Sequence, residues 1–266
     1  MERILWVYWE MAPGVHSLPP HIALCREIME RNARDYRLNV VTPENIRTYL
    51  PDLPDRLSKI ALKPRGRIQK YFGRRSRRAA AIAVRADYIR AFLLERYGGI
   101  YIDSDAIVLG DLSEFFAAVE RVGFTITQRE SFGKSHVSIN FYGSAPGNSI
   151  ITEYTDFMRW RITGNLDHTY NEVGADVLTP IVNRHLSNVA IIPERLIQPV
   201  TYEDADAKFA STTLELADVV APEARVFMLY NHPFRRGGSM ELADREQLIN
   251  GNTLLSKVFR HALASG

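Results

Sequence analysis

The stretch from residue 79 to residue 112 limits most strongly what this chain can fold into. It opens with apolar side chains that recur at helical spacing, and the pair Gly98-Gly99 ends that run as a helix C-cap. An apolar strand over residues 100–109 follows at once, interrupted by two acids, Asp103 and Asp105. The apolar helix positions are Ile82, Val84, Ala86, Tyr88, Ile89, Phe92, Leu93 and Tyr97. This stretch therefore joins an amphipathic helix to a strand that carries two carboxylates.

The rest of the chain alternates strand and helix patterns. Near the N-terminus the order is a strand over 4–9, a helix over 19–34, a strand over 38–41 and a helix that starts at Thr42-Pro43. This order favours an α/β fold over an all-α or all-β one. Later patterns predict strands at 122–127, 137–142 and 224–230, and helices at 148–162, 173–186 and 242–263. Since no repeat or linker interrupts the chain, we predict one domain over residues 1–266.

Composition excludes several classes of protein. With 46% hydrophobic and 24% charged residues, the chain is typical of soluble globular proteins. A single cysteine, Cys25, excludes an internal disulfide framework and a cysteine-based zinc site. The formal net charge of +2 does not indicate a nucleic-acid partner. The N-terminal apolar run is too short for a signal segment or a membrane span, so we expect a cytoplasmic protein.

Asp103 and Asp105 are the strongest sign of chemistry. Residues i and i+2 of a strand point to the same side, so the two carboxylates are expected to converge near a strand end. Like charges in an apolar setting repel one another, and a hard divalent cation such as Mg²⁺ or Mn²⁺ between them relieves this. The alternative is a solvated turn after the strand, because a lone D-x-D motif is weak.

The preceding helix carries a second charged pair. Asp87 and Arg90 lie three residues apart, so they share one face of the helix. Such a pair is commonly a surface ion pair that contributes little. Here it lies within an otherwise apolar helix shortly before the two acids, which favours a functional role.

A helix with A-D-x-x-R, then Y-G-G, then a strand with D-x-D resembles a known family. The combination over residues 79–112 is similar to the core of nucleotide-sugar glycosyltransferases of the GT-A fold. The likeness is to glycosyltransferase family 32 and the capsular polysaccharide synthesis proteins, whose core is shared with clostridial glucosylating toxins. Residues 38–57, LNVVTPENIRTYLPDLPDRL, also look like the capsular group. The resemblance implies a single GT-A domain with a mixed, mostly parallel sheet flanked by helices.

The resemblance also implies roles for particular residues. Trp9, with Tyr8, would stack on the nucleobase of the donor. Asp87, Arg90 and Asp103 would act on the ribose, phosphate and sugar of the donor as the catalytic set. Asp105 would ligate Mn²⁺ or Mg²⁺, with Asp103, Asn231 or His232 completing the metal site.

Further matches follow in the second half. Asn140 would face the donor from a strand, and Gly174 and Thr179 match a T-G-P-x-x-L-T motif in which Ala175 replaces proline. The family's final tryptophan is Met240 here.

The implied reaction moves a sugar from a nucleotide-sugar donor, expected to be a UDP-sugar, to a glycan acceptor. The family retains the anomeric configuration, and we expect front-side attack because no dedicated nucleophile stands out. A divalent ion and a nearby arginine would stabilise the charge that develops on the leaving diphosphate. A capsule or O-antigen role implies a glycan or lipid-linked oligosaccharide acceptor.

The basic stretch 63–78 contains eight lysines and arginines and no acid. It is either a solvated loop or a contact for an anionic partner, such as a diphosphate or the inner face of a membrane.

Three alternatives stay open. A protein-modifying bacterial effector shares the same core. A haloacid-dehalogenase-like phosphatase also has D-x-D after an apolar strand, but near the N-terminus and with Thr or Val where Ile107 stands here. A non-catalytic nucleotide-sugar-binding module is the third, although the presence of Asp87, Arg90, Asp103 and Asp105 argues against it.

Overall fold

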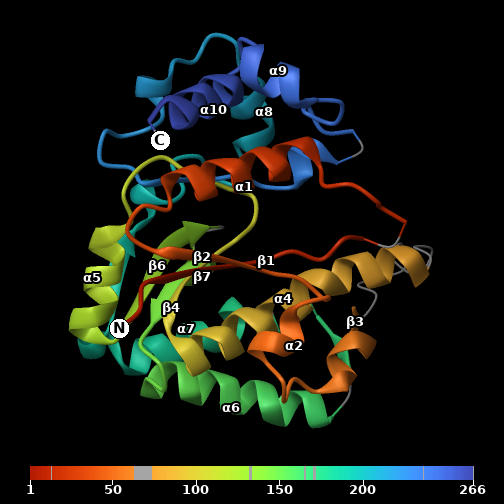
Figure 1. Cartoon of the computed structure of the whole chain (residues 1–266), viewed down its shortest axis with the longest axis vertical. Coiled ribbons are helices and arrows are strands. Elements are labelled where there is room, and N and C mark those ends of the chain that lie inside the picture. Colours follow the sequence, from red (N-terminus) through yellow and green to blue (C-terminus); the bar gives the residue numbers. More distant parts are fainter. Residues whose placement is uncertain are drawn as a thin grey trace. The chain divides into compact units, whose positions relative to one another are not determined.

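The computed structural model describes the chain except residue 13, residues 63–73, 132–133, residue 165, residues 170–171, residue 236 and residue 266. Many of its elements are labelled in Figure 1. The chain forms two compact units. Unit 1 consists of Met1–Ser17, Asn39–Ile102 and Phe115–Ile191, and unit 2 consists of Leu18–Leu38, Asp103–Glu114 and Ile192–Gly266. The single domain over 1–266 stays a prediction.

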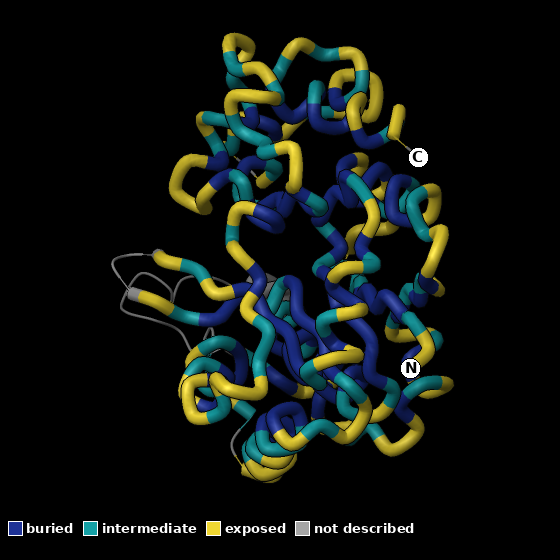
Figure 2. Tube along the Cα trace, turned by 90° about the vertical axis from the view of Figure 1, so that its left-hand side faces the viewer, coloured by how far each residue is buried: buried dark blue, intermediate teal, exposed yellow. Residues whose placement is uncertain are grey.

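The largest sheet has six strands in the order β2-β1-β4-β7-β6-β9. Strand β1 pairs parallel with β4, whereas β7 pairs antiparallel with both β4 and β6. Every residue of β1 and β4 is buried. Figure 2 colours the buried segments of the chain dark blue. The strands are β1 (Ile4–Tyr8), β2 (Arg37–Val41), β4 (Gly99–Ile102), β6 (Phe124–Ser131), β7 (Lys134–Ser144) and β9 (Ala190–Pro193). The predicted α/β fold with a mixed sheet flanked by helices is confirmed.

The helices of unit 1 include α4, which packs against both β1 and α6. The short strand β3 also contacts α4, and it pairs parallel with the short strand β8. The bounds are α2 (Ile46–Tyr49), β3 (Ala61–Leu62), α4 (Arg74–Tyr97), α5 (Ser113–Val122), α6 (Ser149–Thr163), β8 (Asp167–His168) and α7 (Ala175–Arg184). The amphipathic helix predicted before Gly98 is confirmed, and it begins at Arg74.

The turn from α4 into β4 requires glycine. Gly98 and Gly99 have φ angles of +67° and +97°, which L side chains rarely adopt. A Cβ on Gly99 would lie 2.4 Å from the carbonyl oxygen of Ile4 on the neighbouring strand. The indole N–H of Trp6 donates to the Gly98 carbonyl at 2.8 Å, so the same turn is anchored to β1. The predicted glycine C-cap is thus confirmed, with β4 starting at its second glycine.

Unit 2 has its own hydrophobic core around a two-stranded antiparallel sheet. Strand β5 pairs with β10, with Ile107 opposite Phe227 at the centre of the ladder. Leu24, Cys25 and Ile28 of α1 are buried in this core together with residues of α10. The elements are α1 (Pro20–Asn32), β5 (Ala106–Val108), α8 (Ala205–Ala210), β10 (Val226–Met228), α9 (Arg245–Asn250) and α10 (Leu254–Ser265). Short 3₁₀ turns span Asp55–Lys59, Leu186–Asn188, Glu194–Leu196, Leu216–Asp218 and His232–Phe234.

Two predicted helices differ from the structure. The helix predicted over 242–263 is divided into α9 and α10, because the backbone of Gly251 is extended at the C-cap of α9 (φ −65°, ψ 169°). The helix start predicted at Thr42 is a turn instead. Asn45 accepts from the Thr42 backbone N–H through its side chain, and the one-turn helix α2 begins after it.

No helix in the described part of the chain is long and apolar enough to cross a bilayer. Most of the basic stretch 63–78 lies outside the described residues, and only the backbone of residues 74–78 is described, as the first turn of α4.

Candidate functional site

The end of β1 in unit 1 carries a polar cluster around Tyr8. The buried Tyr8 hydroxyl donates to Glu10 Oε2 at 2.8 Å. Arg85 of α4 donates to the same carboxylate through Nε at 2.9 Å and through Nη2 at 2.5 Å. Burial, together with the nearby Glu10 charge, raises the pKa of Tyr8 far above its ordinary value, so this phenol stays protonated. Sequence reasoning missed Glu10 and Arg85, although it named Trp9, next to Glu10, and Asp87, two residues after Arg85.

Trp9 is half-buried immediately after β1. Its backbone N–H donates to the Val41 carbonyl oxygen at 3.0 Å, so the hydrogen bonding between β1 and β2 continues one residue beyond β1. Its indole Nε1 is buried and has no hydrogen-bond acceptor within the described part of the chain. A buried N–H without an acceptor costs free energy, so a bound acceptor would stabilise it.

Asp87 and Arg90 form an ion pair inside unit 1. Arg90 Nη2 lies 3.3 Å from Asp87 Oδ1, and the two side chains are only 6% and 11% exposed. The guanidinium also donates to the Ile139 carbonyl oxygen of β7 at 2.5 Å and lies 4.6 Å over the Tyr101 ring. A surface ion pair, the bland alternative, is therefore excluded. The pair joins α4 to β4 and β7.

Asn140 and Gly174 occupy β7 and the start of α7. Asn140 is half-buried, and its Oδ1 accepts from the Ser138 hydroxyl at 2.7 Å. Gly174 is buried and directly precedes α7. The helix starts at Ala175, the position at which the family has proline. Thr179 Oγ1 accepts from the Val137 backbone N–H at 3.2 Å, which ties α7 to β7. The structure thus ties the predicted α7 motif to the strand that bears Asn140.

Asp103 and Asp105 lie in a turn between β4 and β5. The expectation that they share one side of a continuous strand is wrong, because β4 ends at Ile102 and β5 begins at Ala106. The two acids thus lie in a turn after a strand, as the alternative has it, and both are half-buried. The Asp105 carbonyl oxygen accepts from the Leu229 N–H at 2.8 Å, which extends the β5–β10 pairing up to the turn.

Asn231 is the predicted residue that the structure brings to Asp105. Its Nδ2 donates to Asp105 Oδ2 at 3.0 Å, and its Oδ1 lies 3.4 Å from His21 Nε2. The His21 ring is buried and stacks on Phe234, with 3.8 Å between ring centroids and 11° between planes. Burial lowers the pKa of His21 from 6.5 to about 4, so the ring is neutral at physiological pH. Sequence reasoning missed His21, since nothing local to the start of α1 indicates Asn231 as its neighbour.

His232 contacts a tyrosine ring, whereas its neighbour Asn231 contacts Asp105. Its ring lies 4.4 Å from the Tyr202 ring, and its Nδ1 is buried without a hydrogen-bond partner among the described residues. Burial lowers the pKa of His232, although the Asp206 charge opposes this. Met240, at the position of the family's tryptophan, is buried in the core of unit 2.

The residues around Asp105 offer oxygen ligands to a hard cation. In the described ranges, no group of three or more His, Cys, Asp or Glu side chains gathers as a metal cluster. Mg²⁺ and Mn²⁺ are commonly held by one or two carboxylates, with water and substrate phosphates supplying the other ligands. Asp103 and Asp105 fit such a partial set, since both are half-buried acids in one turn.

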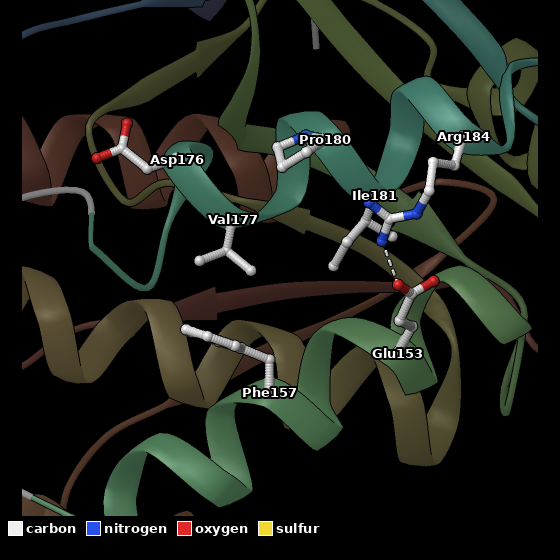
Figure 3. Close-up of a pocket in the computed structure, with 7 residues that line it drawn as sticks. All are labelled: Glu153, Phe157, Asp176, Val177, Pro180, Ile181 and Arg184. Carbon is white, nitrogen blue, oxygen red and sulfur yellow. Dashed lines mark hydrogen bonds and ion pairs between the residues drawn. The ribbon is translucent and has the colours of Figure 1, made fainter.

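A pocket between α6 and α7 lies apart from these residues within unit 1 (Figure 3). Its apolar wall is formed by Phe157, Val177, Pro180 and Ile181, and Asp176 stands at one end. The ion pair between Arg184 and Glu153 lies at the other end. None of the predicted site residues lines this pocket.

Comparison with known proteins decides the family. Residues 1–162 match the family described as "Capsular polysaccharide synthesis protein", which is more than half of the chain. The chain belongs to this family. The family resemblance read from the segment 79–112 is therefore confirmed, and that segment lies within the matched residues. Gly174, Asn231 and His232 of this capsular polysaccharide synthesis protein lie beyond them.

Several solved structures are similar to the chain at low sequence identity. The PaToxG glycosyltransferase is 17% identical, with 70% of each chain covered and a TM-score of 0.44. The glycosyltransferase GlyE of Streptococcus pneumoniae TIGR4 is 11% identical over 99% of this chain and 64% of its own, with a TM-score of 0.47. The galactosyltransferase LgtC is 9% identical over 98% of this chain and 96% of its own, with a TM-score of 0.49. No protein of curated function matches the sequence.

Proposed function

We propose that this capsular polysaccharide synthesis protein is a metal-dependent GT-A glycosyltransferase that moves a sugar from a UDP-sugar to a glycan acceptor. The observation that carries the proposal is the half-buried Asp105 carboxylate, held by Asn231 in a turn directly after a buried strand. The family match includes this turn and the buried Asp87–Arg90 pair, which supports the same assignment.

We assign different residues to the base and to the diphosphate of the donor. Trp9 stacks on the base, and its buried indole N–H has no acceptor in the described chain, so it is available to a polar atom of the donor. Asp103 and Asp105 hold the divalent cation, with Asn231 acting on the Asp105 carboxylate. When bound, the cation supplies electrophilic stabilisation of the charge on the leaving diphosphate. Arg90 is ion-paired with Asp87 and donates to the Ile139 carbonyl oxygen. We therefore assign Asp87 and Arg90 to holding the structure of the donor site.

The acceptor side of the proposal rests on the family. We infer a glycan or lipid-linked oligosaccharide acceptor, transfer with retention of configuration, and a cytoplasmic enzyme working at the inner face of the membrane. The basic stretch 63–78 supports contact with an anionic surface through its charge alone.

The test is the release of UDP from a panel of UDP-sugars, with Mn²⁺ and with EDTA, because slow donor hydrolysis requires no acceptor. Asp105→Asn keeps the shape of the side chain and removes its charge. We expect Mn²⁺-dependent release from one sugar, reduced at least about 100-fold in the variant, since charge stabilisation at the leaving group is lost.

The matched control is Glu246→Gln, an equal loss of charge at an exposed position on α9 of the same unit. It should release UDP at the wild-type rate. Release that is equal in EDTA and Mn²⁺ would contradict metal dependence, and binding of neither UDP nor Mn²⁺ would refute the transferase assignment.

A further inference from the structure

Three side chains of unit 2 form a hydrogen-bonded series that ends at Asp105. His21 Nε2 lies 3.4 Å from Asn231 Oδ1, and Asn231 Nδ2 donates to Asp105 Oδ2 at 3.0 Å. The three residues come from α1, from the segment after β10, and from the β4–β5 turn. The separation of 126 residues between Asn231 and Asp105 shows that the fold, not local sequence, brings them together.

The chemistry of the Asp105 end determines the orientation of the whole series. An ionised carboxylate only accepts hydrogen bonds, so Asn231 must present its NH₂ group to Asp105. The amide oxygen of Asn231 then faces His21. Since that oxygen is also only an acceptor, the His21 ring must carry its proton on Nε2.

Packing holds the His21 ring in place for this contact. His21 is the second residue of α1, it is buried, and its ring lies flat against Phe234. Phe234 ends the 3₁₀ turn that Asn231 precedes, so one short segment supplies both the ring that packs on His21 and the amide that receives its proton. A residue held in this way can fix an amide that would otherwise be able to rotate by 180°.

We propose that His21 is a positioning residue for the cation site: its imidazole fixes the Asn231 amide, and the amide fixes the plane of the Asp105 carboxylate. This inference rests on the proposed function, in which Asp105 holds the cation. It also changes the role predicted for Asn231 from metal ligand to hydrogen-bond donor. Residues that orient a metal ligand in this way typically contribute 10- to 100-fold to metal affinity.

The experiment measures Mn²⁺ affinity in the presence of UDP by the electron paramagnetic resonance signal of free Mn²⁺. His21→Phe keeps a ring to stack on Phe234 and removes the N–H. His21→Gln restores a donor, because Gln Nε2 is as many bonds from the backbone as His Nε2. His261→Phe is the matched control, at an exposed position of α10 in the same unit.

We expect His21→Phe to weaken Mn²⁺ binding about tenfold, and His21→Gln and His261→Phe to stay within about threefold of wild type. In an Asn231→Ala background, His21→Phe should cause no further loss, since the series is already broken. Thermal unfolding without metal checks that the variants are folded.

Different results overturn different statements. If wild type binds Mn²⁺ and His21→Phe binds it equally tightly, the role of His21 is wrong and the proposed function stands. If wild type with UDP binds no Mn²⁺, the proposed metal dependence falls, and this inference falls with it. If His21→Phe does not fold, long-range ¹H–¹⁵N correlation spectra of wild-type protein decide: a proton on Nε2 supports the proposal, and a proton on Nδ1 refutes it.

Discussion

Replacing Asp87 with Asn tests the buried ion pair of α4 in the intact protein. The Arg90 and Asp87 side chains are 6% and 11% exposed, so little water screens either charge. Removing one partner of such a pair commonly costs about 3–5 kcal/mol, because the other charge stays buried. Arg90 keeps its bond to the Ile139 carbonyl oxygen and its place over the Tyr101 ring. We therefore expect the lower end of that range, about 3 kcal/mol.

A double-mutant cycle separates the pair from its surroundings. Arg90→Met alone leaves Asp87 buried and should also cost about 3–4 kcal/mol. The double variant Asp87→Asn, Arg90→Met has no buried charge left at this position. Its cost should fall to about 2 kcal/mol, chiefly for the Ile139 carbonyl oxygen that loses its donor. The two single losses should thus exceed the double loss by several kcal/mol, on the order of 4.

Tryptophan fluorescence during urea unfolding is the assay, because all three tryptophans, Trp6, Trp9 and Trp160, belong to unit 1, as the pair does. The control is Asp156→Asn, which breaks an i,i+3 ion pair of the same spacing with Arg159 whose side chains are 49% and 67% exposed. That change should cost less than about 0.5 kcal/mol. Single losses that add up to the double loss within about 0.5 kcal/mol would refute the reasoning.

Three further predictions concern acidity, the α4–β4 turn and the donor base. Because the folded pKa of His21, about 4, lies below its ordinary 6.5, the unfolded chain binds more protons between these values, so stability is complete above 6.5 and lost as pH falls. The free energy of unfolding, followed by circular dichroism, should drop by about 2 kcal/mol between about pH 7.5 and about pH 5, and His21→Phe should shrink the drop. Gly99→Ala should lower the melting temperature far more than Gly147→Ala: both have positive φ, but only at Gly99 would the new Cβ meet a carbonyl oxygen, at 2.4 Å. Trp9→Phe removes the buried indole N–H and should weaken UDP binding, measured by calorimetry, about tenfold. Trp160 is 67% exposed, so Trp160→Phe should leave UDP binding unchanged. Equal UDP affinity for the two variants would show that Trp9 is not part of the donor site.

Local patterns were enough to predict the elements next to the candidate site. The helix before Gly98 and the strand predicted over 4–9 carry a strong periodic or β-branched pattern, and the structure confirms both, with the strand ending at Tyr8. Asn148 accepts from the Ile150 N–H as the cap of α6, so the helix predicted from residue 148 also starts where its sequence indicates. These features depend on neighbours within a few residues, which a single sequence records.

The features that were missed depend on distant residues. The apolar run 100–109 reads as one strand, but the structure divides it into β4 and β5, and the partner of β5 is the distant strand β10. The Glu10–Arg85 contact joins residues 75 apart, and no pattern around either residue indicates the other. His21 reads as one more polar residue at the start of a helix. The role proposed for His21 depends on its contact with Asn231, which is 210 residues away.

The interleaving of the two units has a consequence for the order in which the chain is made. The only partner that the structure gives β5 among the described strands is β10, so β5 leaves the ribosome without the strand that completes its sheet. Until the distant β10 is synthesised, an apolar strand has an open edge, the kind of surface through which nascent chains associate wrongly. Asp105 likewise lacks its hydrogen-bond donor until Asn231, 126 residues later, has been synthesised. A prematurely terminated or slowly translated product is therefore most exposed to aggregation at β5, the strand that directly follows the turn with Asp103 and Asp105.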